Sequence, residues 1–266
     1  MREKYLPYYA TYSARAPITF IFDMLFRART SGQRISLNYR LHDYLKLQKN
    51  PQLFILHRKI NAILLDALKK WPDHDYGEGY FYQSCSEVEL GGLRDTAGRM
   101  QAMHLRDYCK NMYVVDIGCN SGFLDIALAP IARKITGFDI NPFIIDIGKE
   151  VLAYLGVTNV ALSATTFEVF IASEPADIVL SFANHSTFDG NTEQTVRTYI
   201  EKCHQILRPD GLLLFESHHP TYESKESLEE TCKIITEMFS LQERRILQSK
   251  NFFDNGRTFI VARKTT

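Results

Sequence analysis

The stretch from Tyr113 to Leu124 constrains the fold more than any other part of the chain. A short apolar run with Asp116 near its end is followed by two glycines, Gly118 and Gly122, and then by a second apolar segment. A parallel strand that turns in this way into a helix brings its backbone close to a nucleoside at the carboxyl end of the strand. The stretch therefore predicts a nucleoside-binding α/β domain; the plainer alternative is a strand, turn and helix without a ligand.

The spacing of these glycines argues against a dinucleotide site. A G-x-G-x-x-G loop would need glycines at positions 118, 120 and 123, but Asn120 and Phe123 occupy the second and third of them. We therefore expect a nucleoside ligand without a pyrophosphate, and the missing third glycine disfavours an oxidoreductase.

Strand and helix patterns alternate from residue 113 onward, which predicts right-handed crossovers and a mostly parallel sheet covered on both faces. An Asn255-Gly256 turn signal precedes the last strand, so the sheet is expected to end in an antiparallel pair. We expect strands over 114–117, 134–140, 160–164, 178–182, 212–216, 243–247 and 258–262, and helices over 123–133, 142–155, 192–207 and 227–239.

The chain before this sheet is expected to be helical. Apolar residues at three- and four-residue steps between Leu53 and Leu68 predict one face of an amphipathic helix, which begins at Asn50-Pro51 and ends at Trp71-Pro72. An irregular segment over 75–99 contains five glycines, and such a loop is commonly functional or merely a linker. We divide the chain into a helical lid segment (1–75), a cofactor-covering linker (76–109) and a binding domain (110–266).

The distribution of charge and of cysteines limits the possible binding partners and the cellular compartment. The net charge is zero, yet residues 1–60 hold eleven Lys or Arg and three Asp or Glu. This basic segment indicates either an anionic substrate such as RNA or a phosphorylated metabolite, or a solvated face that docks on the acidic remainder. Five scattered cysteines without a C-x-x-C pair favour reduced thiols, and the apolar stretches are too short for a membrane span, so we expect a cytoplasmic protein.

The motifs from residue 110 to 263 resemble, in order, those of the class I S-adenosylmethionine-dependent methyltransferases. The resemblance implies a doubly wound Rossmann-like sheet with an antiparallel C-terminal strand and S-adenosyl-L-methionine as cofactor. Asp139, 17 residues after Gly122, then binds the ribose hydroxyls, although it can also be read as a helix N-cap ahead of Pro142. Asp116 faces the methionyl amino group, and the backbone from Gly118 to Gly122 lies under the ligand.

Further cofactor contacts are expected on both sides of this motif. Thr166 and Phe167 replace the acidic residue that many members place after the third strand, and Arg94 or Arg99 is a candidate for the cofactor carboxylate or for a structural salt bridge. The full expected cofactor set is Tyr82, Gln83, Ser84, Arg94, Asp116, Gly118, Cys119, Asn120, Gly122, Phe123, Asp139, Ile140, Thr166, Phe167, Phe182, Ala183 and Asn184.

Three side chains are candidates for the chemistry of transfer. His185 follows the fourth strand, at the methyl-transfer position of this fold, and is the leading candidate for a general base; a histidine bonded to a loop carbonyl is the alternative. Glu216 and His218 follow the fifth strand and are the next candidates. Their spacing carries no metal-ligand signal, and no metal is expected.

The resemblance leaves the acceptor open. The run from Gly118 to Gly122 is similar to the Gly-Cys-Asn-x-Gly form of the RNA 5′-phosphate methyltransferases, and the Arg94-Asp95 segment is similar to one in the tRNA wobble-uridine carboxymethyltransferases. Our leading hypothesis is methylation of a small or medium-sized polar metabolite, at oxygen. An RNA-modifying methyltransferase and a non-catalytic cofactor-binding module are the alternatives.

Overall fold

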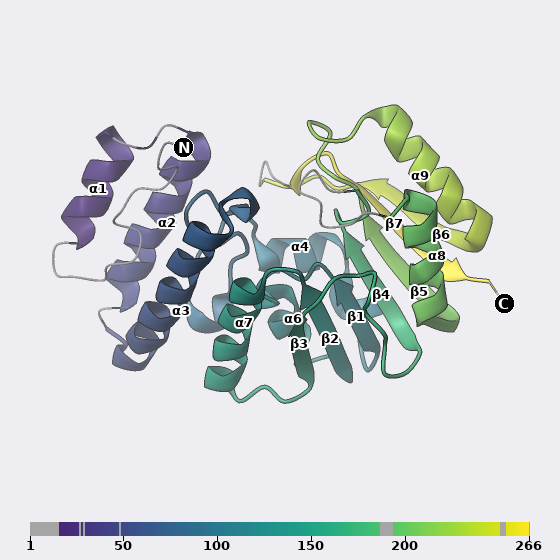
Figure 1. The fold of residues 1–266 in the computed structure, drawn as a ribbon, viewed down its shortest axis with the longest axis horizontal. Helices are drawn as coiled ribbons and strands as arrows, with labels where there is room; N and C mark the ends of the chain where they lie inside the picture. The colour runs from purple at the N-terminus through teal and green to yellow at the C-terminus, as the bar shows by residue number, and fades with distance from the viewer. Residues whose placement is uncertain are drawn as a thin grey trace.

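The computed structural model describes residues 16–26, 28, 30–47, 49–186, 194–250 and 254–265, and shows a helical segment followed by a seven-stranded sheet (Figure 1). The helices are α1 (Ala16–Phe26), α2 (Ser31–Leu47), α3 (Pro51–Lys70), α4 (Thr96–Ala102), α5 (Leu105–Tyr108), α6 (Phe123–Leu128), α7 (Pro142–Leu155), α8 (Val196–Ile206) and α9 (Lys225–Met238). The strands are β1 (Tyr113–Ile117), β2 (Lys134–Asp139), β3 (Val160–Ala164), β4 (Ala176–Phe182), β5 (Leu207–Glu216), β6 (Phe239–Ile246) and β7 (Thr258–Lys264).

The strands are arranged in the order β3-β2-β1-β4-β5-β7-β6. The first five are parallel to their neighbours, whereas β7 pairs antiparallel with both β5 and β6. This arrangement confirms the predicted doubly wound sheet and its antiparallel ending. Because β1 lies between β2 and β4, the chain reverses direction across the sheet at β1, and a crevice forms at the carboxyl ends of these strands.

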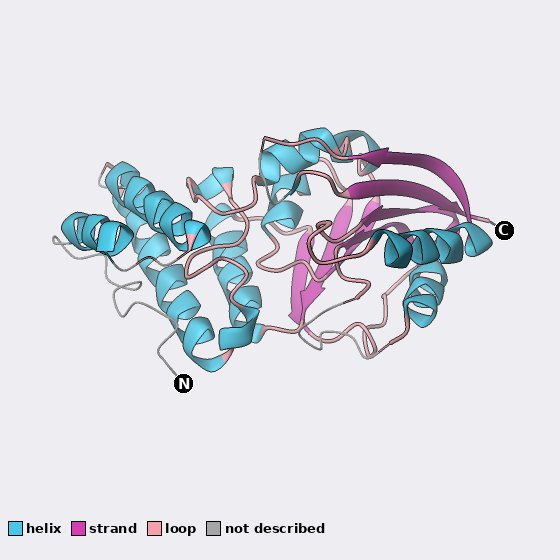
Figure 2. Ribbon diagram, turned by 90° about the horizontal axis from the view of Figure 1, so that it is seen from above, coloured by secondary structure: helices cyan, strands magenta, loops and turns pink. Residues whose placement is uncertain are grey.

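Alternating side chains of β1 pack into two separate hydrophobic cores, one on each face of the sheet. Val114 packs in the core that contains α3, α6 and α7, while Tyr113, Val115 and Ile117 pack in the core that contains α8 and α9. Figure 2 shows the helices on either side of the twisted sheet. By the same alternation, Asp116 points to the α6 side, which places a carboxylate rather than an apolar group at the end of that core.

The helical segment is attached to the sheet mainly through α3. Asn50 caps this helix, its Oδ1 accepting from the Leu53 amide at 3.2 Å, and the helix ends before Trp71, as predicted. Its apolar face is buried, and α3 packs against α7. Lys59 of this basic segment pairs with Glu150 of α7 at 2.5 Å, so at least one of its charges docks on the acidic remainder of the chain.

Several predicted boundaries were wrong for identifiable reasons. The predicted helix over 123–133 ends at Leu128, because Pro130 lacks the N–H needed to continue it. Strand β5 begins at Leu207 rather than 212; residues 208–211 form an irregularity between the pairings of Ala176 with Leu207 and of Ile178 with Leu212. Strand β6 begins at Phe239, four residues earlier than predicted. The start of the predicted helix over 192–207 lies partly outside the described residues.

No helix within the described residues is both long and apolar enough to cross a bilayer. All five cysteines are buried, and none forms a disulfide.

Candidate functional site

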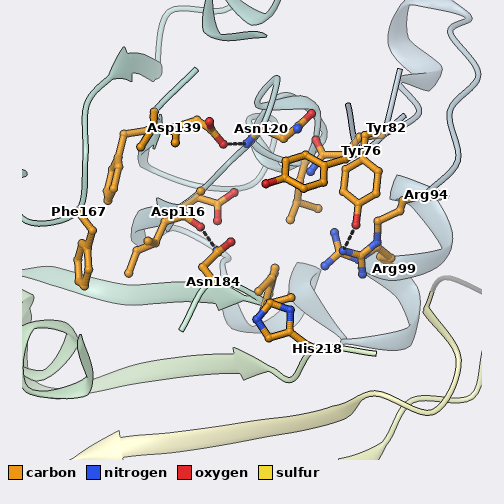
Figure 3. Close-up of a pocket in the computed structure, with 18 of the residues that line it drawn as sticks. Tyr76, Tyr82, Arg94, Arg99, Asp116, Asn120, Asp139, Phe167, Asn184 and His218 are labelled. Carbon is orange, nitrogen blue, oxygen red and sulfur yellow. Dashed lines mark hydrogen bonds between the residues drawn. The ribbon is translucent and has the colours of Figure 1, made fainter. Parts of the chain in front are cut away.

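A cavity of about 390 Å³ opens at the carboxyl ends of the parallel strands. The ends of β1, β2 and β4 contribute Ile117, Asp139 and Phe182 to its wall. In Figure 3, Asp139 and Phe167 lie on one side of this cavity, and Tyr82, Arg94 and Arg99 lie on the other. The cavity therefore has an acidic and aromatic end and an arginine-rich end.

Most of the residues predicted from the sequence line this cavity. They are Tyr82, Gln83, Arg94, Asp116, Gly118, Asn120, Asp139, Ile140, Phe167, Phe182, Ala183, Asn184 and His218. The structure does not bring the remaining predicted residues to the cavity wall: Ser84, Cys119, Gly122, Phe123, Thr166, His185 and Glu216.

The turn after β1 requires its two glycines. Gly118 and Gly122 have φ angles of +63° and +65°, a region that residues with a side chain rarely adopt. A Cβ at position 118 would lie 2.6 Å from Oδ1 of Asn184, and a Cβ at position 122 would lie 2.7 Å from Cδ1 of Leu162. Gly118 lies at the cavity wall, and its missing Cβ makes room for the Asn184 side chain, whereas Gly122 allows close packing against Leu162.

Asp139 is held at the end of β2 by backbone donors. Its Oδ2 accepts from the Asn120 amide at 3.1 Å, and its Oδ1 accepts from the Asn141 amide at 3.0 Å. Burial raises the pKa of Asp139, and these two hydrogen bonds oppose the rise. The N-cap of α7 is Asn141, whose side chain accepts from the Phe143 amide, so Asp139 is not needed for capping.

Beside Asp139 the cavity wall is aromatic. Phe167 stacks on Phe138 with ring centroids 6.1 Å apart and packs against Tyr199 at 4.8 Å. Thr165, rather than the predicted Thr166, contributes to the wall next to them. This end presents flat apolar faces next to a carboxylate, a combination that suits a base and its sugar.

Asp116 is buried against a second acid. Burial raises the pKa of Asp116 to about 7, nearby Asp139 adds to the rise, and a hydrogen bond with Asp125 and the charge of Arg99 oppose it. Asp125 is fully buried on α6, and burial together with Asp116 raises its pKa well above the ordinary value. Of these two acids, Asp116 is the one that reaches the cavity.

The arginine-rich end is tied together by two buried acids. Arg94 donates from Nε to Asp254 at 2.6 Å and from Nη2 to Glu216 at 3.0 Å, and Arg99 donates from Nη2 to Glu216 at 2.6 Å. Burial alone would raise the pKa of Glu216, but Arg94, Arg99 and Arg257 outweigh it and lower this pKa to about 2. Glu216, predicted as a catalytic candidate, is thus an ionised anchor for arginines that line the cavity.

The two predicted histidines take different positions. His185 is buried, and its Nε2 lies 2.7 Å from Oε1 of Glu223. Glu223 also accepts from the backbone amide of His218 at 2.9 Å, which positions the His218 ring at the cavity. Burial and nearby His185 lower the pKa of His218 to about 4, so this imidazole is neutral at pH 7. Of the two, only His218 faces the cavity.

Sequence reasoning missed several cavity residues. Asp75, Tyr76 and Glu78 come from the irregular segment over 75–99, for which the sequence left a functional loop and a linker as alternatives. Arg257 follows the Asn-Gly turn, and Tyr222 lies between β5 and α9. No sequence motif indicated that these two residues would line the cavity. Within the described residues, no group of three or more His, Cys, Asp or Glu side chains is arranged to hold a metal ion.

Comparison with protein families identifies a domain family for the second half of the chain. Residues 109–256, more than half of the chain, match the family model described as "Methyltransferase domain". A ubiquinone biosynthesis O-methyltransferase from Actinobacillus pleuropneumoniae serotype 7 (strain AP76) is 26% identical over 118 residues, 42% of this chain and 47% of that protein. The chain thus matches this curated relative over about half of the relative's length.

Solved structures share the fold at low sequence identity. The N-methyltransferase NodS from Bradyrhizobium japonicum WM9, in complex with S-adenosyl-L-homocysteine, matches with a TM-score of 0.52 and 20% identity over 63% of this chain and 87% of that one. The [4+2]-cyclase SpnF matches with a TM-score of 0.51 and 14% identity over 62% of this chain and 80% of that one. Because proteins with such different names share the fold, fold alone does not identify the reaction.

Proposed function

The chain belongs to the methyltransferase-domain family, and from this premise we propose that it uses S-adenosyl-L-methionine to methylate a small or medium-sized polar metabolite, at oxygen. The similarity to a protein named as a ubiquinone biosynthesis O-methyltransferase supports transfer of the methyl group to an oxygen atom of a small molecule. The observation that carries the proposal is the cavity itself, in which a glycine turn, a carboxylate and an aromatic wall meet at the strand ends.

The residues present fit this cofactor. Gly118 lies at the cavity wall with φ of +63°, a conformation that allows the turn to bring its backbone to a ligand. Asp139 would accept from the ribose hydroxyls, the faces of Phe138 and Phe167 would cover the base, and Asp116 would receive the methionyl ammonium group. These residues lie at the ends of β1 and β2 or in the turns after β1 and β3, and the three strands are neighbours at one side of the sheet.

The bound cofactor supplies a methyl group on a sulfonium that is already activated for transfer. The protein must therefore chiefly position the acceptor and exclude water. Tyr76 and Glu78 bring the segment that follows the N-terminal helices onto the cavity wall. We propose that this segment and the helices before it form a lid over the acceptor.

His218 replaces His185 in our proposal for the group that meets the acceptor. Its imidazole is at the cavity and neutral, so it can accept a hydrogen bond from the acceptor. With a pKa of about 4 it is a weak base, because proton transfer is most effective when the pKa lies near the working pH. An acceptor that is already ionised, or easily ionised, suits such a site.

Isothermal titration calorimetry tests the proposal directly. We expect saturable binding of S-adenosylhomocysteine and no comparable binding of NAD, because Asn120 and Phe123 occupy the positions of the second and third glycines of a dinucleotide loop. NAD binding of similar strength would exclude the proposed cofactor.

Asp139→Ala is expected to weaken S-adenosylhomocysteine binding by about 1.5–3 kcal/mol, the range for hydrogen bonds to a charged group. Asp139→Asn is the matched control, because it keeps the shape and one acceptor for the backbone amides but has no charge. We expect an intermediate loss for it. Unchanged affinity in a folded Asp139→Ala protein would show that the carboxylate serves only the turn.

A further inference from the structure

The first helix of the chain turns an apolar face to solvent. Figure 1 shows α1 at the end of the helical segment that lies away from the sheet, and α1 packs against α2. Five of its side chains are 43–74% exposed: Ile18, Ile21, Phe22, Leu25 and Phe26. They stand at positions i, i+3, i+4, i+7 and i+8, which lie on one face of a helix. Such a face is normally directed to a core, so its exposure here indicates an interaction surface.

The exposed charges next to this face are basic. Only residues 27–30 lie between α1 and α2, and Arg34, in the first turn of α2, is exposed. Lys46 is exposed in the last turn of the same helix. The acids that the structure describes in α1 and α2 are Asp23 and Asp43, and both are buried. The surface that these two helices present to a partner is therefore apolar and positively charged.

The same part of the chain is attached to the cavity wall. Oγ1 of Thr30 donates to Oε2 of Glu78 at 3.1 Å, and Oγ of Ser36 donates to the Gly77 carbonyl at 2.7 Å. Glu78 is one of the residues that line the cavity. A partner that binds to α1 and the start of α2 is thus connected to the cavity through a single layer of hydrogen bonds.

We propose that α1 and α2 bind the surface of an anionic lipid bilayer, with the apolar face of α1 among the headgroups and Arg34 and Lys46 near the lipid phosphates. Helices that lie in a membrane interface combine an apolar face with basic residues, and both contribute to binding. A second copy of the chain fits less well, because two positively charged surfaces would repel each other. RNA would leave the apolar face of α1 in water. The proposal stands independently of the proposed reaction.

Sedimentation of the full chain with lipid vesicles tests the proposal. One set of vesicles contains phosphatidylcholine alone, and the other contains phosphatidylcholine mixed with phosphatidylserine. We expect the protein to bind the anionic vesicles about tenfold or more tightly than the neutral ones, and added salt should reduce the difference. Absence of binding to the anionic vesicles, or equal binding to both sets, would overturn the proposal.

Leu25→Ser combined with Phe26→Ser should weaken binding to the anionic vesicles by about tenfold or more, because it removes two of the apolar side chains that enter the interface. Val169→Ser combined with Ile171→Ser is the matched control. These two side chains are 68% and 88% exposed, but they follow β3 and stand beside Glu168 instead of an arginine. The control should bind as the wild type does. Equal binding by the two double variants would show that α1 is not the docking surface.

Phe26→Trp gives a second readout that does not depend on the folding of the double variant. Its added fluorescence should be quenched by vesicles that contain brominated lipids, and the wild type, whose single tryptophan is Trp71, provides the background. No added quenching would mean that α1 does not enter the bilayer.

Two other results would assign the surface to a different partner and overturn the proposal. The first is a dimer that Leu25→Ser with Phe26→Ser dissociates, measured by analytical ultracentrifugation, in a protein that binds no vesicles. The second is RNA binding that Arg34→Gln weakens, again without vesicle binding. Arg106→Gln is the control for charge, because Arg106 is an exposed arginine on α5. Thermal unfolding shows whether each variant is folded.

Discussion

Glu216→Ala is expected to lower the free energy of unfolding by about 3–5 kcal/mol, the cost of removing one partner from a buried ion pair. The substitution leaves Arg94 and Arg99 buried with Asp254 as the remaining carboxylate. Breaking the cluster costs more than either single ion pair contributes, because an uncompensated charge stays out of water. Urea unfolding followed by circular dichroism measures the loss.

A surface ion pair provides the control. Glu237 pairs with Arg197 at 2.6 Å, but both side chains are more than 40% exposed, so Glu237→Ala should cost less than about 1 kcal/mol. Glu216→Gln should fall between the two, because it keeps acceptors for Arg94 and Arg99 without the charge. A cost for Glu216→Ala no larger than that of Glu237→Ala would contradict the role of Glu216 as an anchor.

The contribution of Glu216 to the free energy of unfolding should decrease at low pH. The folded-state pKa of Glu216, about 2, is below its ordinary value of 4.5. Its contribution is therefore fully present above pH 4.5 and is lost as the pH falls toward 2. The difference in stability between wild type and Glu216→Ala should shrink over that window.

Local patterns were enough to predict the sheet and to predict residues that meet at one cavity, such as Asp116, Gly118 and Asp139. The strand, the two glycines and Asp139 lie within one βαβ unit, where residue spacing determines the geometry. Even there the pattern did not separate Thr165 from Thr166, because a one-residue difference after a strand decides which side chain faces the cavity.

The arginine-rich end could not be predicted because its contacts join distant parts of the chain. Arg94 meets Glu216 and Asp254, which lie 122 and 160 residues further along the sequence. His185 illustrates the same point: its place after β4 suggested the acceptor site, but Glu223, 38 residues later, binds the imidazole away from the cavity. A histidine at the expected position therefore says little until its partner is known.

The acidic pair at the cofactor end leads to the second large expected effect, a strong pH dependence of cofactor binding. Asp116 can receive a methionyl ammonium group only when it is ionised, and burial raises its pKa to about 7. Because the ligand prefers the ionised form, affinity should fall as the pH drops below this pKa, by up to tenfold per pH unit. Between about pH 8 and pH 5 the affinity for S-adenosylhomocysteine should fall by up to about 100-fold.

Two conservative variants test whether Asp116 causes this pH dependence of cofactor binding. Asp116→Asn should bind weakly at every pH, with most of the slope removed, because its side chain does not titrate. Asp125→Asn should keep the slope, because Asp116 still titrates in this variant. Asp139, at the same end of the cavity, also has a raised pKa. If the slope persists unchanged in Asp116→Asn, the pH dependence of binding arises from Asp139 and not from Asp116. Calorimetric titration of each variant across this pH range, with unfolding curves at the same pH values, separates loss of binding from loss of fold.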